Sequence, residues 1–208
     1  MQREAALEML ADGLVGACSA AVARVWTLGP GDICGECPMR SECPDQTQCL
    51  HLVKSAGVST RIDGAFRRFP LGAREVGRVS QTLEPFVLND DVARLGVADA
   101  TWLMVHDVRG FAVVPLVYEG QCIGVAAVFA KDLITGERLA TLQALAAFAT
   151  GIIVGAATSR PATLPPVMPK VKPVPRQQQP SIQFLRPLEA TERDVIERVL
   201  DHTHGRVS

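Results

Sequence analysis

The residues best suited to chemistry are four cysteines, Cys34, Cys37, Cys43 and Cys49, in the stretch DICGECPMRSECPDQTQC. Their spacing is C-x2-C-x5-C-x5-C, and only one further cysteine follows them in the chain. Thiolates are the soft ligands that bind iron–sulfur clusters and zinc, and a C-x2-C pair lets one tight turn present two sulfurs to one centre. We therefore expect these four side chains to bind a common metal centre.

Two features of this segment favour an iron–sulfur cluster over zinc. Prolines directly follow Cys37 and Cys43, and prolines often flank cluster cysteines. Structural zinc sites usually use two paired cysteine knuckles, and only one pair is present here. An iron–sulfur cluster is therefore the first prediction, with 4Fe-4S as the default for four thiolates, and zinc is the alternative.

Other polar and thiol side chains receive weaker predictions. His51 would lie on the same side of its strand as Cys49. His51 and Asp32 are therefore candidates to hydrogen-bond the metal ligands without binding the metal themselves. Most strand histidines and loop aspartates have no such role. We expect Cys18 and Cys122 to pack as small apolar side chains. No catalytic residue is predicted.

Length and composition predict one domain with an appendage. The chain has 208 residues, 48% of them hydrophobic, and a net charge of −1, so it lacks the cationic surplus that drives non-specific nucleic-acid binding. No signal peptide is visible, and the weakly polar run from 144 to 157 is shorter than the roughly 20 residues of a membrane span. We expect a cytoplasmic protein without membrane contact, whose cysteines are ligands or redox thiols rather than disulfides.

The N-terminal half of the sequence predicts elements that hold the cysteines. Leucines at helical spacing predict a helix over 2–16, and alternation predicts strands over 21–28 and 49–57. The cysteine segment, 31–49, would then be an insertion in the hairpin that joins these strands.

The following residues predict the rest of an α+β domain. A turn is expected at 66–71, a helix at 73–83, and a short strand at PFVLND, whereas 89–110 cannot be assigned. Two apolar strands, 111–118 and 121–130, form a predicted hairpin at Glu119-Gly120 and precede a helix that ends near Ile153.

The C-terminal quarter changes in composition. Seven of the 14 prolines lie between Arg160 and Ser181, which predicts an extended linker over 158–184. Beyond it, Thr191 is a predicted N-cap for one short amphipathic helix within 185–208. That helix is too short to be stable without a packing partner.

The second hairpin and the helix after it resemble the closing half of a GAF domain. The likeness is in FAVVPLVYEGQCIGVAAVFA followed by ERLATLQALAAFATGI, with Pro-Leu in the first strand, a Gly turn, and Ile-Gly-Val in the second. The resemblance covers roughly 1–157. It implies a central antiparallel sheet with flanking helices, a sensory role, and a homodimer formed through the terminal helices.

Two further segments resemble parts of bacterial transcriptional regulators. The cysteine segment ending in CLHLVKSAG is similar to a subset of GAF domains in which inserted cysteines are thought to hold an iron–sulfur centre. LEATERDVIERVLDHTHGRVS looks like the start of a Fis-type helix-turn-helix, and the sequence stops at Ser208 before a recognition helix. The resemblance thus implies a redox or gas sensor that regulates transcription, with DNA contact only through a helix-turn-helix that is incomplete here.

Two other function classes stay open. A GAF module stapled by zinc could bind a small ligand or another protein. Some GAF-fold proteins reduce free methionine sulfoxide with a nucleophilic and a resolving cysteine. Four clustered cysteines exceed what that thiol chemistry needs, and no neighbouring general base is evident.

Overall fold

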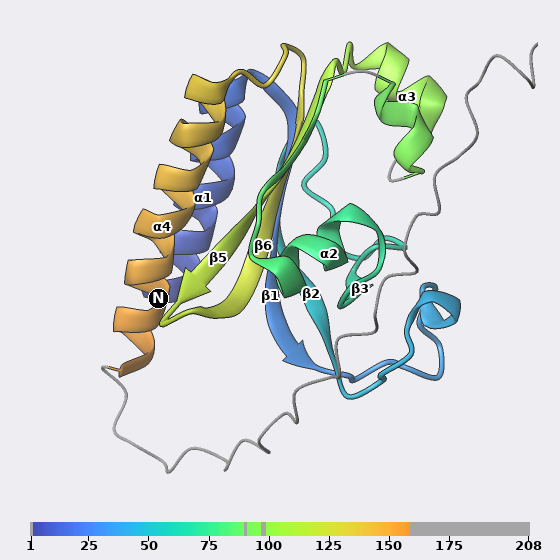
Figure 1. The fold of residues 1–208 in the computed structure, drawn as a ribbon, viewed down its shortest axis with the longest axis vertical. Helices are drawn as coiled ribbons and strands as arrows, with labels where there is room; N and C mark the ends of the chain where they lie inside the picture. The colour runs from blue at the N-terminus through green and yellow to red at the C-terminus, as the bar shows by residue number, and fades with distance from the viewer. Residues whose placement is uncertain (1, 90, 97–98, 159–208) are drawn as a thin grey trace, which may run out of the picture. The chain divides into compact units, whose positions relative to one another are not determined.

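A computed structural model describes residues 2–89, 91–96 and 99–158. Almost all of the predicted linker and the whole predicted Fis-like segment lie outside these residues. The described part is a six-stranded antiparallel sheet with helices on both faces (Figure 1). The strand order is β3-β2-β1-β6-β5-β4. The β1–β2 and β5–β6 pairs are the two longest, and they are joined in the middle of the sheet by the antiparallel pairing of β1 with β6. This architecture confirms the predicted α+β class.

The elements follow the predicted order with small shifts at their ends. They are α1 (Gln2–Cys18), β1 (Ala20–Pro30), the short 3-10 helix η1 (Arg40–Glu42), β2 (Gln48–Gly57), β3 (Arg68–Pro70), α2 (Arg74–Thr82), β4 (Phe86–Leu88), the 3-10 helix η2 (Val92–Leu95), α3 (Ala100–Val105), β5 (Gly110–Tyr118), β6 (Gln121–Ala130) and α4 (Gly136–Thr158).

One face of the sheet is covered by α1 and α4, which run side by side (Figure 1). Alternation along β1 places Ala23 and Val25 on this face, where they pack with Leu14 of α1 and Leu142 of α4. Among the described residues, α4 is the helix long and apolar enough to cross a membrane by length and composition alone. Its inward residues contribute to the core here, so a domain helix accounts for its apolar character.

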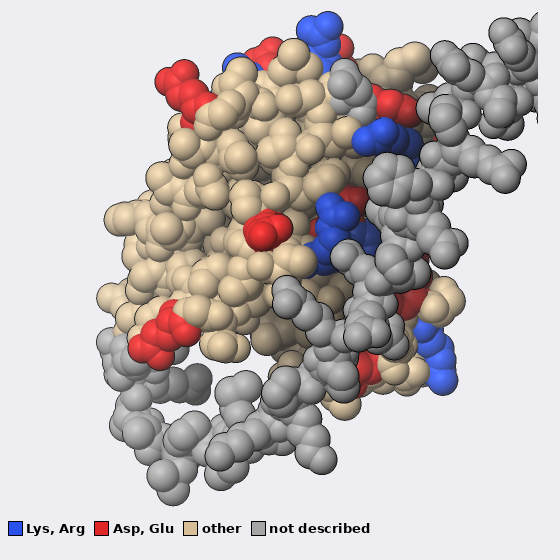
Figure 2. Space-filling view, in the orientation of Figure 1, with Lys and Arg blue, Asp and Glu red and all other residues tan. Residues whose placement is uncertain are grey.

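The outer surface of α4 is also poor in charge. Its charged residues are Glu137 and Arg138 near its start, and Figure 2 shows few charged side chains over this part of the molecule. Phe148 of α4 is 63% exposed and Met9 of α1 is 53% exposed. The outer surface of α4 is therefore largely apolar, whereas α1 also exposes Arg3, Glu4, Glu8 and Asp12.

The opposite face of the sheet carries a second core, under α2, α3 and the cysteine loop. Val22 and Trp26 of β1 point to this face and pack with Leu50, Phe69 and other apolar side chains. Trp26 also donates from its indole N–H to the backbone oxygen of Phe66, at 3.0 Å. The cysteine loop thus belongs to the face of the sheet that lies away from the terminal helices.

Two segments differ from the expectations. Residues 66–71 are not only a turn, because Arg68–Pro70 pairs with Cys49–His51 as the edge strand β3. A run with two arginines and a proline is typical of turns, but an edge strand tolerates proline. The unassigned stretch 89–110 contains η2 and α3, both too short to give a periodic signal.

Candidate metal centre

The four loop cysteines lie at the end of the β1–β2 hairpin. Pro30 pairs with Gln48 and Gly29 with Cys49, so the two strands deliver the ends of the insertion next to each other, as the sequence predicts. All four cysteines, Cys34, Cys37, Cys43 and Cys49, line one pocket. The topology therefore brings the predicted ligands around one space.

The thiols are held differently within this pocket. Cys49 stands on β2 and is 7% exposed, whereas Cys34, Cys37 and Cys43 are partly exposed on the loop. Cys34 Sγ donates to the backbone oxygen of Gln46 at 3.2 Å. All six cysteines of the chain are free thiols. Four uncrosslinked sulfurs around one pocket are what a shared metal centre requires.

The distances among these sulfurs bear on the kind of centre. No three of the four cysteine sulfurs lie within 4.8 Å of one another. A single zinc ion with zinc–sulfur bonds of about 2.3 Å would hold four tetrahedral sulfurs about 3.8 Å apart. A cubane cluster presents a separate iron atom to each thiolate, so its ligands stand further apart. The four sulfurs as they stand are therefore not at the mutual spacing of a single zinc site.

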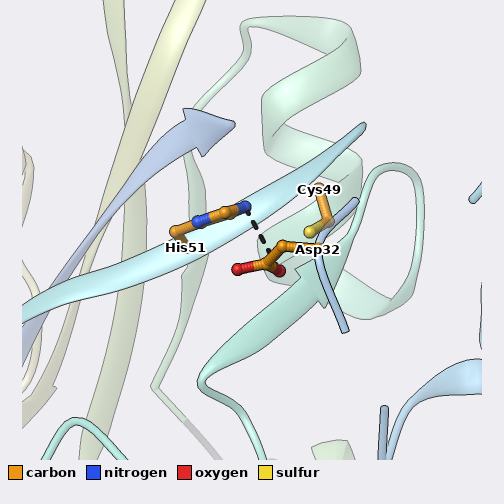
Figure 3. A group of neighbouring side chains, drawn as sticks. All are labelled: Asp32, Cys49 and His51. Atoms are coloured by element: carbon orange, nitrogen blue, oxygen red, sulfur yellow. Dashed lines mark ion pairs between the residues drawn. The ribbon is translucent and has the colours of Figure 1, made fainter. Parts of the chain in front are cut away.

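A second set of metal-binding atoms overlaps the pocket, because two of its three residues, Asp32 and Cys49, line it. Ligand atoms of Asp32, Cys49 and His51 are all within 4.8 Å of one another, and Figure 3 shows the histidine ring beside the carboxylate. His51 Nε2 is 3.9 Å from Asp32 Oδ1. Three different ligand types at this separation are a possible cation site by distance alone.

Hydrogen bonding shows that Asp32 and His51 are already engaged. Both carboxylate oxygens of Asp32 accept from Arg68, at 2.7 and 2.6 Å, and this guanidinium holds the pKa of Asp32 well below its usual range. His51 Nε2 lies 2.7 Å from the backbone oxygen of Pro30. A carbonyl oxygen only accepts, so Nε2 carries a hydrogen and has no lone pair for a metal. Both residues thus support the loop from outside the sulfur set.

The pKa values of the thiols reflect their surroundings. The pKa of Cys49 is raised to about 11, mainly by burial, with further contributions from the nearby Asp32 carboxylate and the Cys34 thiol. The pKa of Cys43 is raised as well, again by burial first and then by Cys34 and Cys37. Cys34 and Cys37 thus lie within electrostatic reach of both Cys43 and Cys49.

Two arginines line the same pocket, and the sequence analysis did not single out either of them for this site. Arg40 donates from Nη1 to the backbone oxygen of Cys34 at 3.1 Å, and Arg68 holds Asp32. Four bound thiolates leave an iron–sulfur centre with a net negative charge, which nearby guanidinium groups stabilise. In the sequence, Arg40 lies between Cys37 and Cys43. Arg68 reaches the pocket only because β3 pairs with β2, and the sequence did not predict that pairing.

The loop is also fixed to the rest of the fold. Met39, between the second and third cysteines, is 3% exposed and packs in the core of the face that carries α2. Glu42 accepts from Arg74 of α2 at 2.7 to 3.2 Å, and Arg74 Nη1 also donates to the backbone oxygen of Gly96 at 2.7 Å. A change in the loop therefore acts directly on α2 and on the turn after η2.

The remaining cysteines lie away from the pocket. Cys18 ends α1 and is fully buried among apolar side chains. Cys122 stands on β6, partly buried, and its sulfur donates to the backbone oxygen of Gly124 at 3.2 Å. Burial raises the pKa of both thiols. Both fit the expected role of a small packing side chain.

Comparison with known proteins identifies the class. The family model of the GAF domain matches residues 22–154, so the chain belongs to the GAF domain family. The matched region contains the sheet, the cysteine loop and most of α4. A comparison with functionally curated proteins gave no match.

Solved structures share the fold at low sequence identity. The GAF domain of a phosphoenolpyruvate-protein phosphotransferase from Acinetobacter is 17% identical, with a TM-score of 0.55, over 76% of this chain and 86% of that one. The GAF-B domain of DevS from Mycobacterium smegmatis is 17% identical, with a TM-score of 0.54, over 76% and 97%. The free methionine-R-sulfoxide reductase from Neisseria meningitidis is 20% identical, with a TM-score of 0.51, over 74% and 81%. These likenesses establish the fold, and membership of the GAF family supports a sensory or ligand-binding domain.

Proposed function

We propose that the chain is a cytoplasmic sensory protein of transcriptional control in which Cys34, Cys37, Cys43 and Cys49 hold an iron–sulfur cluster, 4Fe-4S by ligand number. The observation that carries the proposal is the single pocket lined by all four thiols. When bound, such a cluster supplies a centre that an oxidant, oxygen or nitric oxide can alter or remove.

The chain's own residues would transmit that change. Three thiols stand on the loop and Cys49 stands on β2, so loss of the centre would free the loop from the strand. The ion pair between Glu42 and Arg74 joins the loop to α2. On the other side, β1 connects α1 to the loop. A change in loop order would therefore shift the populations of α2 and the sheet relative to the terminal helices.

The proposal extends to partners. The weakly charged outer surface of α4, with Phe148 exposed, supports a homodimer formed through the terminal helices. DNA contact would be made through the helix-turn-helix of which 185–208 resembles the beginning. Such an arrangement would pass the state of the cysteine loop to an operator.

The decisive experiment is purification of the full chain under argon, followed by metal and acid-labile sulfide analysis and a visible spectrum. Brown protein with about four iron and four sulfide per chain supports the proposal. Colourless protein with one zinc per chain would replace it by the zinc-stapled module. Absence of any bound metal, together with thiol-dependent reduction of free methionine sulfoxide, would replace it by the thiol enzyme.

The thiol environments count against the enzyme. A nucleophilic cysteine needs a lowered pKa, whereas burial raises the pKa of Cys43, Cys49 and Cys122. The fold shared with a methionine-R-sulfoxide reductase does not alter this, because the same fold hosts unrelated functions. We therefore propose no enzymatic activity.

A further inference from the structure

A second hollow lies on the α3 side of the sheet, lined by residues that include none of the four loop cysteines. Its volume is about 410 Å³, within the range of small-molecule sites. Its walls are formed largely by apolar and aromatic side chains, among them Phe66, Trp102 and Phe129. Trp102 and Phe129 meet edge to face, with ring centroids 5.8 Å apart. This hollow can accept a flat apolar group.

Arg24 of β1 opens into this hollow from a half-buried position between two core residues. Its neighbours on the same face of the strand, Val22 and Trp26, are 0% and 2% exposed. The sequence pattern thus places a cation where an apolar residue would be expected. A buried charge is costly unless another group pairs with it.

The described residues provide no such partner. Arg24 Nε is buried and has no hydrogen-bond partner, and no ion pair of this arginine occurs among the described residues. Burial lowers the pKa of Arg24, and no acidic group opposes this effect. The part of the chain that the structure describes therefore offers Arg24 no negatively charged hydrogen-bond acceptor.

The other charged groups that line the hollow are already engaged. Arg61 donates to both carboxylate oxygens of Asp63, at 3.0 and 3.2 Å. Asp99 accepts from the backbone N–H of Trp102 at 3.0 Å and caps α3. Of these three charged groups, Arg24 is the one without a hydrogen-bond partner among the described residues, so we assign it the role of ligand anchor.

We propose that this hollow binds a small organic anion, with its carboxylate on the Arg24 guanidinium and a flat apolar body against Phe66, Trp102 and Phe129. A planar guanidinium suits a carboxylate because it can donate two parallel hydrogen bonds. The inference is independent of the metal centre. It gives the protein a second input besides the cysteine loop.

The test uses the full chain with 2-naphthoate as probe and 2-naphthamide as its uncharged counterpart. Titration is followed by calorimetry and by tryptophan fluorescence, since Trp102 lines the hollow. We expect saturable 2-naphthoate binding and at least about tenfold weaker binding of the amide, because a charge-assisted hydrogen bond is lost. Arg24→Met should weaken naphthoate to a similar extent, whereas Arg3→Met on α1 should leave it unchanged. Equal binding of acid and amide, no naphthoate binding, or binding unaffected by Arg24→Met would overturn the proposal.

A second measurement does not depend on the choice of probe. Without a ligand, Arg24→Met should unfold at the same temperature as the unaltered chain or at a higher one, because an unpaired buried charge is removed. A clearly lower unfolding temperature would mean that Arg24 has a partner within the protein. That result would contradict the proposed site even if naphthoate bound.

Discussion

At the scale of single residues, the four loop thiols are not equivalent. Cys49 is fixed by a strand and buried, whereas Cys34, Cys37 and Cys43 depend on the loop for their positions. Asp32 and Arg68 fasten the start of the loop to β3 by two short hydrogen bonds. The proposed centre would thus be assembled from one rigid ligand and three that the loop must bring to it.

The first prediction concerns the ligand set. Serine at Cys34, Cys37, Cys43 or Cys49 should remove most of the bound iron, since an alcohol is a poor substitute for a thiolate. Cys18→Ser and Cys122→Ser are the matched controls and should retain it. Iron per chain after anaerobic purification is the measurement, and similar losses in both groups would contradict the assignment.

The second prediction concerns thiol reactivity in metal-free protein. The pKa of Cys49 is about 11, against the reference value of 9.0 for a thiol. The fraction of Cys49 present as thiolate at pH 7 is therefore about 100-fold smaller than for a thiol at the reference value. Its alkylation by iodoacetamide should therefore be slow at pH 7 and should accelerate as the pH rises toward 11. Peptide mass spectrometry at several pH values measures this rate. Fast alkylation of Cys49 at pH 7 would contradict the described burial.

At the scale of elements, the hairpin loop depends on close contacts that side chains would block. A Cβ at Gly31 would overlap the backbone oxygen of Gln46 and lie 2.7 Å from Cys34 Sγ. The two ends of the loop meet there without space for a methyl group. Gly35, in the same loop, has no atom within 4 Å of its Cβ position.

The third prediction uses this pair of glycines. Gly31→Ala should lower iron content by displacing Cys34, while Gly35→Ala should leave it unchanged. Circular dichroism establishes that both variants are folded before iron is measured. Equal iron in the two variants would show that the loop does not depend on this contact.

The fourth prediction concerns the buried methionine of the loop. Met39 is 3% exposed, so Met39→Ala should lower the free energy of unfolding by about 2–4 kcal/mol through the cavity that it leaves. Met104→Ala is the control, because that side chain is 75% exposed and should cost less than about 0.5 kcal/mol. Urea denaturation measures both. An unchanged midpoint for Met39→Ala would mean that the loop is not anchored in the core.

At the scale of the whole molecule, the sheet separates two surfaces with different roles. The terminal helices cover one face, where α4 presents few charges, while the cysteine pocket and the Arg24 hollow belong to the other half of the fold. Association of two chains through the helices would leave both pockets accessible. The proposed dimer and the proposed sensing sites therefore do not compete for surface.

The fifth prediction tests the dimer. Phe148→Lys places a charge on the apolar face of α4 and should shift the protein toward a monomer in sedimentation velocity, because burying an unpaired charge is costly. Iron content should not change. Val58→Lys, at a side chain that is 52% exposed beyond the end of β2, serves as control. An unaltered dimer in the Phe148 variant would place the interface elsewhere.

Much of this fold could be predicted because its hydrophobic pattern is regular. The alternation in β1, β5 and β6 and the helical spacing in α1 and α4 determine which residues face which core. The sequence also predicts the cysteines in a hairpin, and β1 and β2 pair as far as Pro30 and Gln48 on either side of the loop. Short elements such as β3 and α3 could not be predicted, because three to six residues contain less than two periods of a pattern.

The surroundings of the candidate site were less predictable than its cysteines. Arg68 reaches Asp32 from 36 residues away, and Arg74 reaches Glu42 from 32 residues away. Such pairs depend on strand pairing and loop closure, which local composition does not encode. Arg24 could have been noticed from the sequence alone, because it interrupts the apolar side of a strand between Val22 and Trp26.

The indole of Trp26 has an optical consequence. Its ring belongs to the same core as Met39 of the cysteine loop, and its N–H is fixed to the backbone oxygen of Phe66. Iron–sulfur chromophores absorb broadly where tryptophan emits, so a filled pocket would quench this indole by energy transfer. Assembly and decay of the centre could then be followed in real time through intrinsic emission, without an added dye.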